Sequence, residues 1–249
     1  LAARKKSDRA VGSASEVVTS NVTLSGPGEM YCLYCPNYMP RQQAPKEISR
    51  RDHLREQDQV FFRGVKERVF ISATEPIMWR RVVFWQNQRW GVSTPFYGAH
   101  PQTGNPFRIR NMFPMRPETG GADADVGLSL WPGLVGVDYT EDTRWNTRLD
   151  SDSVRVVYDK TTTINPHNQY SAEEQYGDNR RRSLWHPVNR TIRYGDKESG
   201  QDVDPSPWAS SRPGSANMFI LDIFSTGRAS DTDVEFGTWN VESTIYWHE

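Results

Sequence analysis

Long apolar runs are missing from this chain of 249 residues. A membrane-spanning helix needs about 18 or more consecutive apolar residues, and no segment comes near that length. The chain also opens without the apolar stretch of a secretory signal. The sequence therefore predicts a soluble protein that has no membrane partner.

Cysteine is scarce too, because Cys32 and Cys35 are the only two in the sequence. A structural zinc site needs four ligands, and no second cysteine pair or closely spaced histidine pair follows. A redox-active pair normally precedes a helix, whereas Pro36 and Pro40 favour irregular chain here. The pattern favours two reduced thiols near a loop over a metal or redox site.

The motifs of common enzyme classes are absent. The chain has no Gly-x-Ser-x-Gly nucleophile elbow, no phosphate-binding Gly-Lys-Ser/Thr loop and no His-hydrophobic-His pair. The histidines are too far apart in the sequence to suggest a metal site: His53, His100, His167, His186 and His248. Asp123 and Asp125 lie in a polar loop, where solvation is expected and a calcium bridge between subunits is the alternative. We therefore predict a protein that is not an enzyme and needs no cofactor.

Alternation of apolar and polar residues with a period of two recurs along the chain and predicts about eight strands. We expect them over residues 18–24, 60–71, 77–85, 126–137, 154–164, 185–194, 218–224 and 239–247. Gly64 is expected to mark a bulge or a close approach within the second strand. Helix-forming patterns are limited to the short segments 47–57 and 140–149.

Long polar loops separate these strands, and no helices alternate with them. That organisation predicts an all-β fold, an eight-stranded jelly roll of two packed antiparallel sheets with long loops and at most short helices. Residues 16–249 would form this single domain, and residues 1–15 the end of a basic, disordered N-terminal arm. The residues expected to be buried between the sheets are Trp79, Val83, Trp85, Val156, Ile192, Ile220, Phe224, Trp239 and Ile245.

The net charge of −1 conceals an uneven distribution of charged residues. Acidic residues concentrate in the segments 118–125, 141–152 and 196–204, whereas cations occur in separate clusters. This separation suits a protein with one face toward phosphate and another toward solvent. The candidate nucleic-acid-binding residues are Arg4, Lys5, Lys6, Arg9, Arg50, Arg51, Arg80 and Arg81. The alternative for each cluster is a solvated face or an ion pair between subunits.

One long segment, residues 91–119, is too apolar for a solvated loop of its length. We expect it to pack on neighbouring subunits, because aromatic residues and methionine are enriched in protein interfaces. The candidate interface residues are Phe96, Tyr97, Phe107, Met112, Phe113 and Met115.

Four short motifs, in this order, resemble those of one virus family. They are FFRGVKER at 61–68, WRRVVF at 79–84, VVYDKT at 156–161 and NRTIRY at 189–194. Together they resemble the capsid proteins of genomoviruses, which are relatives of the geminiviruses with circular single-stranded DNA genomes. The resemblance implies a viral jelly roll that self-assembles into a small icosahedral shell, T=1 with 60 copies, and packages circular single-stranded DNA.

The same resemblance implies a virion protein that enters the host nucleus for assembly. Family members begin with an arginine-rich arm that is read by the host nuclear import machinery. Only Arg4, Lys5, Lys6 and Arg9 stand at that position here, which suggests that this chain lacks most of the arm. The alternative function is a glycan-binding, lectin-like jelly roll that uses Trp90, Tyr97 or Trp208 as an exposed sugar platform.

Overall fold

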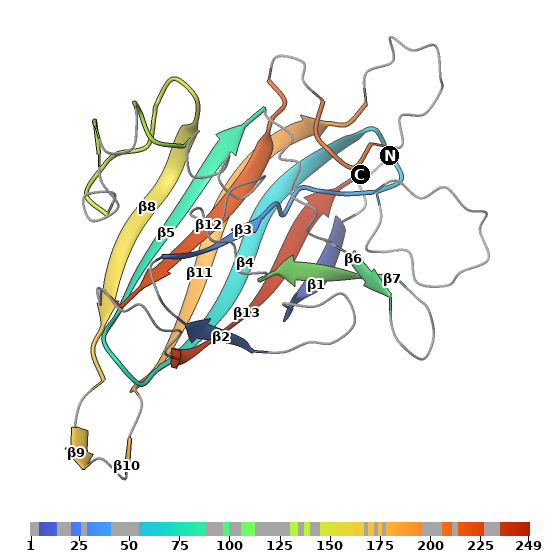
Figure 1. Cartoon of the computed structure of the whole chain (residues 1–249). Helices are drawn as coiled ribbons and strands as arrows, with labels where there is room; N and C mark the ends of the chain where they lie inside the picture. The colour runs from blue at the N-terminus through green and yellow to red at the C-terminus, as the bar shows by residue number, and fades with distance from the viewer. Residues whose placement is uncertain are drawn as a thin grey trace.

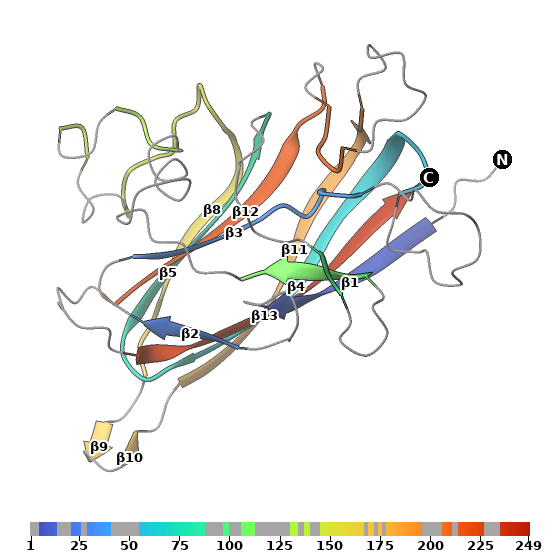
Figure 2. The same cartoon turned by 45° about the vertical axis from the view of Figure 1, so that its right-hand side comes forward.

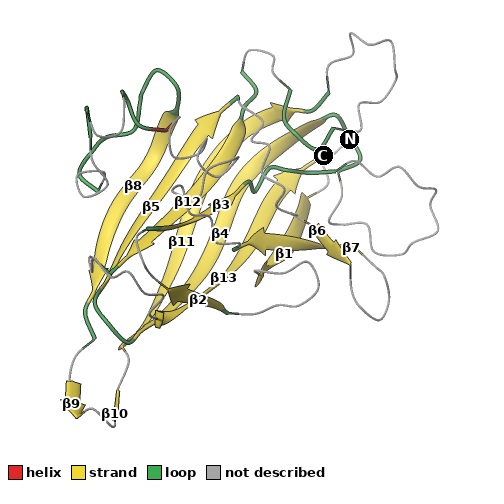
Figure 3. Ribbon diagram, in the orientation of Figure 1, coloured by secondary structure: helices red, strands yellow, loops and turns green. Residues whose placement is uncertain are grey.

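The computed structural model describes residues 5–13, 21–25, 29–40, 55–87, 97–99, 106–112, 130–133, 137–139, 145–166, 169–171, 174–175, 178–195, 206–210, 214–226 and 235–249. Strands dominate these residues, as Figure 3 shows, which confirms the expected all-β class. The described parts of the two segments with helix-forming patterns, 55–57 and 145–149, are not helical. In the part of the chain that is described, no helix is long and apolar enough to span a membrane.

Two sheets face each other, and the chain passes repeatedly between them (Figures 1 and 2). The seven-stranded sheet contains, in order, β11 (Asp178–Arg193), β4 (Gln59–Ala73), β13 (Glu235–His248), β1 (Lys5–Ser13), β7 (Pro106–Asn111) and β6 (Tyr97–Ala99), and β2 (Val22–Ser25) also pairs with β13. The four-stranded sheet contains β3 (Met30–Tyr34), β12 (Asn217–Ser225), β5 (Ile77–Gln86) and β8 (Arg155–Ile164). A small separate hairpin joins β9 (Gln169–Ser171) to β10 (Glu174–Gln175). Every pairing is antiparallel except that of β1 with β7.

The core forms where the apolar faces of the two sheets meet. Period-two alternation places every second side chain of β4 and β13 toward the interior, as their burial patterns show. The predicted core residues are buried as expected, with the single exception of Val156. That residue is 40% exposed. It lies on β8, the edge strand of its sheet, where most side chains face solvent.

Several strands differ from those expected. The described parts of residues 126–137 contain no strand, and Trp131 instead packs against Tyr31 and Tyr139. β11 begins at Asp178, inside the stretch expected to be a loop, because its polar N-terminal half pairs with β4. The pairing also extends to β1, so the expectation of a disordered arm is wrong for Lys5–Ser13. Residues 1–4, 14 and 15 of that arm lie outside the described part of the chain.

Gly64 lies at an irregularity that affects two strand pairs, as its position in the sequence predicted. The register shifts opposite this residue both in β11, between Pro187 and Arg190, and in β13, between Tyr246 and Trp247. Gly64 has a φ of 152°, and a Cβ there would lie 2.5 Å from the backbone oxygen of His186. Only glycine permits this approach of β11 to β4.

The two sheets differ in how their outer faces are covered. All residues of β12 are buried, and so are nearly all those of β5. Leu130, Trp131, Tyr139 and Leu149, from the connection between β7 and β8, belong to the apolar cluster that includes these strands. In the seven-stranded sheet, by contrast, alternate residues of β4 and β13 stay at least partly exposed. Strands β3, β12 and β5 of the four-stranded sheet are therefore covered on both faces, although its edge strand β8 is exposed, and the seven-stranded sheet leaves one face open.

Candidate nucleic-acid interface

The open face of the seven-stranded sheet carries many cations. Exposed cations at alternating positions of β1, β4 and β11 include Lys5, Arg9, Arg63, Lys66, Arg68, Arg181 and Arg193. The carboxylate of Glu242, on β13, lies among them and accepts a hydrogen bond of 2.8 Å from Arg9. Although the chain as a whole has a net charge of −1, this face is positive. We call it the basic face.

Strand register brings these cations next to one another. Lys66 of β4 lies opposite Trp185 of β11 on one side and Thr244 of β13 on the other. Two residues further along β4, Arg68 lies opposite Ser183 and Glu242. Because residues i and i+2 of a strand share a face, these rows form a continuous surface.

Aromatic side chains alternate with the cations on the basic face. Trp185 is 48% exposed and lies edge-on to Tyr246, with ring centres 5.8 Å apart. Four residues before Trp185 on β11, the guanidinium of Arg181 lies 5.7 Å from the centre of the Phe70 ring. These two residues, with Arg68 and Arg182, line a groove of about 500 Å³.

Such a surface can bind single-stranded nucleic acid. Cations that follow a backbone, with aromatic rings on which bases stack, are the usual means of binding single strands without sequence preference. Phosphate contacts position the strand but read no sequence. In the described segments no group of histidine, cysteine, aspartate and glutamate residues could hold a metal ion.

The N-terminal cations that were predicted to bind DNA do not all lie on the basic face. Lys5 and Arg9 are exposed on the basic face. Lys6 points inward, where its Nζ donates to carboxylate oxygens of Glu56 at 2.9 Å and of Glu249 at 2.7 Å. The prediction is therefore wrong for Lys6, because alternation along β1 turns it toward the interior. Arg4, Arg50 and Arg51 lie outside the described residues.

Arg80 and Arg81 are not surface cations either, which corrects the prediction for both. Arg80 is 3% exposed and forms two hydrogen bonds with the Asp159 carboxylate, at 2.9 and 2.7 Å. Arg81 is 1% exposed. It forms two hydrogen bonds with Asp222, at 2.7 and 2.9 Å, and one with Glu67, at 2.6 Å.

Arg81 belongs to a buried ionic network made of Glu67, Arg81, Arg110 and Asp222. Arg110 joins the two carboxylates from the other side, at 3.0 Å from Glu67 and 2.7 Å from Asp222. These four side chains are at most 2% exposed, and their charges cancel. The network lies between two apolar clusters of the core, since Glu67, Arg81 and Asp222 are each flanked at i−2 and i+2 by core residues of different clusters.

Electrostatic effects within the network are strong. Burial alone would raise the pKa of Glu67, but Arg81 and Arg110 lower it to about 2. Burial likewise lowers the pKa of Arg81, and the charges of Asp222 and Glu67 more than offset this and raise it. Glu67 and Arg81 therefore stay charged at neutral pH.

His186 lies next to this network and is expected to make stability pH-dependent. It is 5% exposed, and its Nε2 has no hydrogen-bond partner among the described residues. Burial is the main cause that lowers its pKa below 6.5, and the nearby charges of Glu67, Arg81, Asp222 and Arg110 contribute in both directions. The folded state therefore binds a proton less readily than the unfolded state does.

We expect the thermal unfolding midpoint to fall as the pH is lowered from about 7 to about 5, because protonation then favours the unfolded chain. His186→Gln should make this pH dependence shallower in calorimetry or circular dichroism melts. Glu67 does not contribute in this window, since its stabilisation is lost only below its unfolded pKa near 4.5. His248→Gln, which removes a surface histidine, is the control, and an unchanged slope in His186→Gln would contradict the prediction.

The predicted subunit-interface residues are only partly described. Met112 is fully buried in its own chain, within an apolar cluster that includes Trp239 and Val241, so the prediction is wrong for it. Tyr97 and Phe107 lie on β6 and β7, which pair with each other. Phe96, Phe113 and Met115 lie outside the described residues.

The remaining candidates are the two cysteines, the aromatic residues of the glycan-binding alternative and the aspartates of the calcium alternative. Cys32 and Cys35 are free, buried thiols near the end of β3, and burial raises the pKa of both, which fits the expectation of two reduced thiols. Trp208 packs against Tyr38 and Phe219 and so presents no open sugar platform. Trp90, Asp123 and Asp125 fall in parts of the chain that are not described.

Sequence reasoning missed most of the basic face. Lys66, Arg68, Arg181 and Arg193 were not among the predicted residues, although the alternation that predicts β4 also places Lys66 and Arg68 on its polar side. The cations of β11 could be placed on the basic face only once the pairing of β11 with β4 was known. Comparison of the chain with protein-family models found no match, and comparison with curated proteins found no significant match.

Proposed function

We propose that the protein is the capsid subunit of a genomovirus-like virus, and that it packages circular single-stranded DNA against its basic face. The observation that carries this proposal is the difference between the two sheets. Three strands of one sheet, β3, β12 and β5, are covered on both faces, and the other sheet exposes cations and aromatic rings together. A shell protein needs one face toward a polyanion and others toward its neighbours and solvent.

Strand order supports a jelly roll for this subunit. If β1, β3, β4, β5, β8, β11, β12 and β13 are numbered in chain order, the first pairs with the eighth and the second with the seventh. The third likewise pairs with the sixth, and the fourth with the fifth. A long hairpin wrapped into two sheets produces this order, and viral capsid domains are one of its common uses.

The proposal includes the assembly state and location that the motif resemblance implies. The subunits would form an icosahedral T=1 shell of 60 copies, with parts of the segment 91–119 outside the buried residues 108–112 at contacts between neighbours. The virion is the expected location, and the host nucleus the site of assembly. Any basic residues around Arg4 would serve nuclear import in addition to DNA binding.

We test the proposal with the double variant Lys66→Gln/Arg68→Gln. Each lost phosphate contact should reduce the slope of log K against log salt concentration by about 0.7 for single-stranded DNA. The slope should therefore fall by about 1.4, measured by fluorescence anisotropy with an oligonucleotide. In assembled particles, the ratio of DNA to protein absorbance should fall as well.

The control is Arg148→Gln/Lys160→Gln, which removes two exposed cations that lie off the basic face. It should retain the salt dependence of the wild type. Equal losses in both double variants would refute a specific role for the basic face. Electron micrographs of the purified wild type that show no particles under any assembly condition would refute the capsid role itself.

A further inference from the structure

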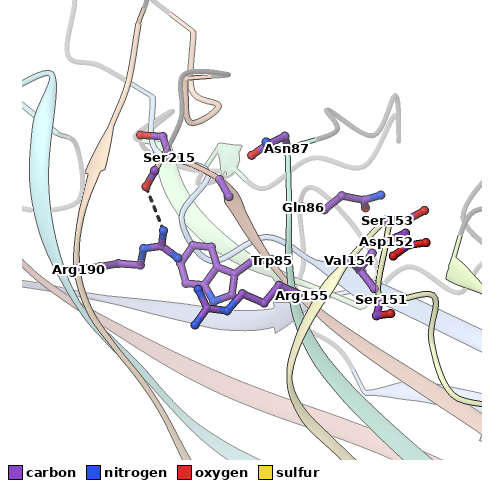
Figure 4. Close-up of a pocket in the computed structure, with 12 residues that line it drawn as sticks. Trp85, Gln86, Asn87, Ser151, Asp152, Ser153, Val154, Arg155, Arg190 and Ser215 are labelled. Carbon is purple, nitrogen blue, oxygen red and sulfur yellow. Dashed lines mark hydrogen bonds between the residues drawn. The ribbon is translucent and has the colours of Figure 1, made fainter.

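A second cationic site lies at one end of the sandwich, away from the basic face. The end of β5, the start of β8, the middle of β11 and the segment before β12 surround a pocket of about 320 Å³ (Figure 4). Trp85, Arg155 and Arg190 line it, together with the hydroxyl-bearing residues Ser151, Ser153 and Ser215.

Arg190 is held in a fixed position in this pocket. Its guanidinium lies over the indole of Trp85, 4.6 Å from the ring centre, and donates a hydrogen bond of 3.0 Å to the backbone oxygen of Gly214. Figure 4 shows the Arg155 side chain approaching the same indole. Trp85 itself is 7% exposed, so the two guanidiniums, rather than the ring, are what the pocket offers to a ligand.

Neither arginine forms an ion pair with a described carboxylate, which distinguishes them from the buried arginines of this chain. Arg80 and Arg108, for example, contact carboxylate oxygens at 2.7 and 2.9 Å. Arg155 is exposed and Arg190 is partly buried, so an anion from solution can reach both guanidiniums. Burial, and next the charge of Arg155, lower the pKa of Arg190, so the two positive charges lie close enough to repel each other.

We propose that this pocket binds a phosphate group, held between the guanidiniums of Arg155 and Arg190. Arginine suits this ligand because its planar N–H groups match the oxygens of phosphate. The hydroxyl of Ser215, which accepts a hydrogen bond from the backbone N–H of Arg193, can donate its proton to another phosphate oxygen. A bound dianion would remove the repulsion between the two arginines.

One carboxylate, that of Asp152, also lines the pocket. Figure 4 shows it beside Ser151 and Ser153, on the other side of the pocket from Arg190. Two guanidiniums against one carboxylate leave the pocket positive. The ligand is thus expected near Arg190 and Trp85 rather than near Asp152.

The phosphate can come from free inorganic phosphate or from a mononucleotide. The Arg190 guanidinium already occupies one face of the Trp85 ring, so we expect recognition of the phosphate and not of a base. This inference does not depend on the capsid role. Binding is measured on the unassembled chain, and its failure would leave the proposed function untouched.

The test is isothermal titration calorimetry of the full chain with inorganic phosphate, with deoxyadenosine monophosphate and with deoxyadenosine. Inorganic phosphate and the nucleotide should bind, and the nucleoside should not. Tighter binding of the nucleotide would identify it as the source, and equal binding would identify the phosphate group alone as the ligand. Arg155→Gln and Arg190→Gln should each weaken binding at least about tenfold, since hydrogen bonds to charged groups are lost.

Arg148→Gln is the matched control, because Arg148 is exposed near the start of β8 but does not line the pocket. It should bind as the wild type does. Should Arg190→Gln fail to fold, Arg190→Lys and the exposed Arg155→Gln supply the comparison, and Arg190→Lys should still bind more weakly than wild type. Binding that is absent in the wild type, unchanged in Arg155→Gln or equally strong for the nucleoside overturns the proposal.

Discussion

Replacing Asp222 with alanine is expected to lower the free energy of unfolding by about 3–5 kcal/mol. Asp222 accepts hydrogen bonds from Arg81, Arg110 and the Trp79 indole, all in the interior. Without it, Glu67 alone would balance two buried guanidiniums. The loss comes mainly from this uncompensated charge rather than from the attraction that is removed. Urea unfolding followed by tryptophan fluorescence measures it.

The control for this prediction is Glu242→Ala. Its ion pair with Arg9 is largely solvated, so the change should cost less than about 1 kcal/mol. Replacement of all four members of the buried ionic network by apolar residues of similar volume should cost far less than Asp222→Ala. If the two single variants lose equal stability, the network does not act as a charge-balanced unit.

Trp239→Ala is the second variant with a large expected effect, about 3–5 kcal/mol of unfolding free energy. Trp239 is fully buried in β13. Its ring lies 5.0 Å from that of Phe224 across the sandwich, and the Arg110 guanidinium lies 5.3 Å from its centre. Alanine would leave a cavity between the sheets, and it would also remove a ring that supports the buried ionic network. Thermal and urea unfolding both measure this.

The variant Trp239→Phe distinguishes the effect of lost apolar contact from the effect of removing the buried indole N–H. The indole N–H of Trp239 has no hydrogen-bond partner among the described residues. Phenylalanine keeps much of the apolar contact and removes this buried donor, so its cost should be clearly smaller than that of alanine. A loss as large as that of Trp239→Ala would indicate that the indole N–H has a partner we have not identified.

The sequence predicts the long strands of this fold because their alternation is strong. β5 shows both the value and the limit of that signal. Trp79, Val83 and Trp85 share one face with Arg81, and alternation alone would therefore place Arg81 inside. The charge of Arg81 led instead to the prediction that it lies on the surface. The partners that make burial tolerable, Glu67 and Asp222, come from strands 14 and 141 residues away in sequence.

β1 shows what local sequence cannot predict. KKSDRAVGS has the composition of a flexible arm, and only pairing with β13 and β7 makes it a strand. The basic face depends on the same long-range pairing, because Lys66 of β4 meets Trp185 of β11 only once these strands are aligned. The uneven distribution of charge predicted a face toward phosphate, but only strand register shows which cations lie together.

The position of β13 also constrains when this chain can fold. It is the last strand among the described residues, yet it lies between β4 and β1 in the middle of its sheet. β4 ends at residue 73 and β13 at residue 248, and a ribosome that adds about 5–20 residues per second needs on the order of 10–35 s for the residues between these two positions. Until then β1 and β4 lack the neighbour that joins them, and their apolar sides remain uncovered. The yield of folded protein should therefore depend on how well the nascent chain is kept from aggregating before β13 emerges.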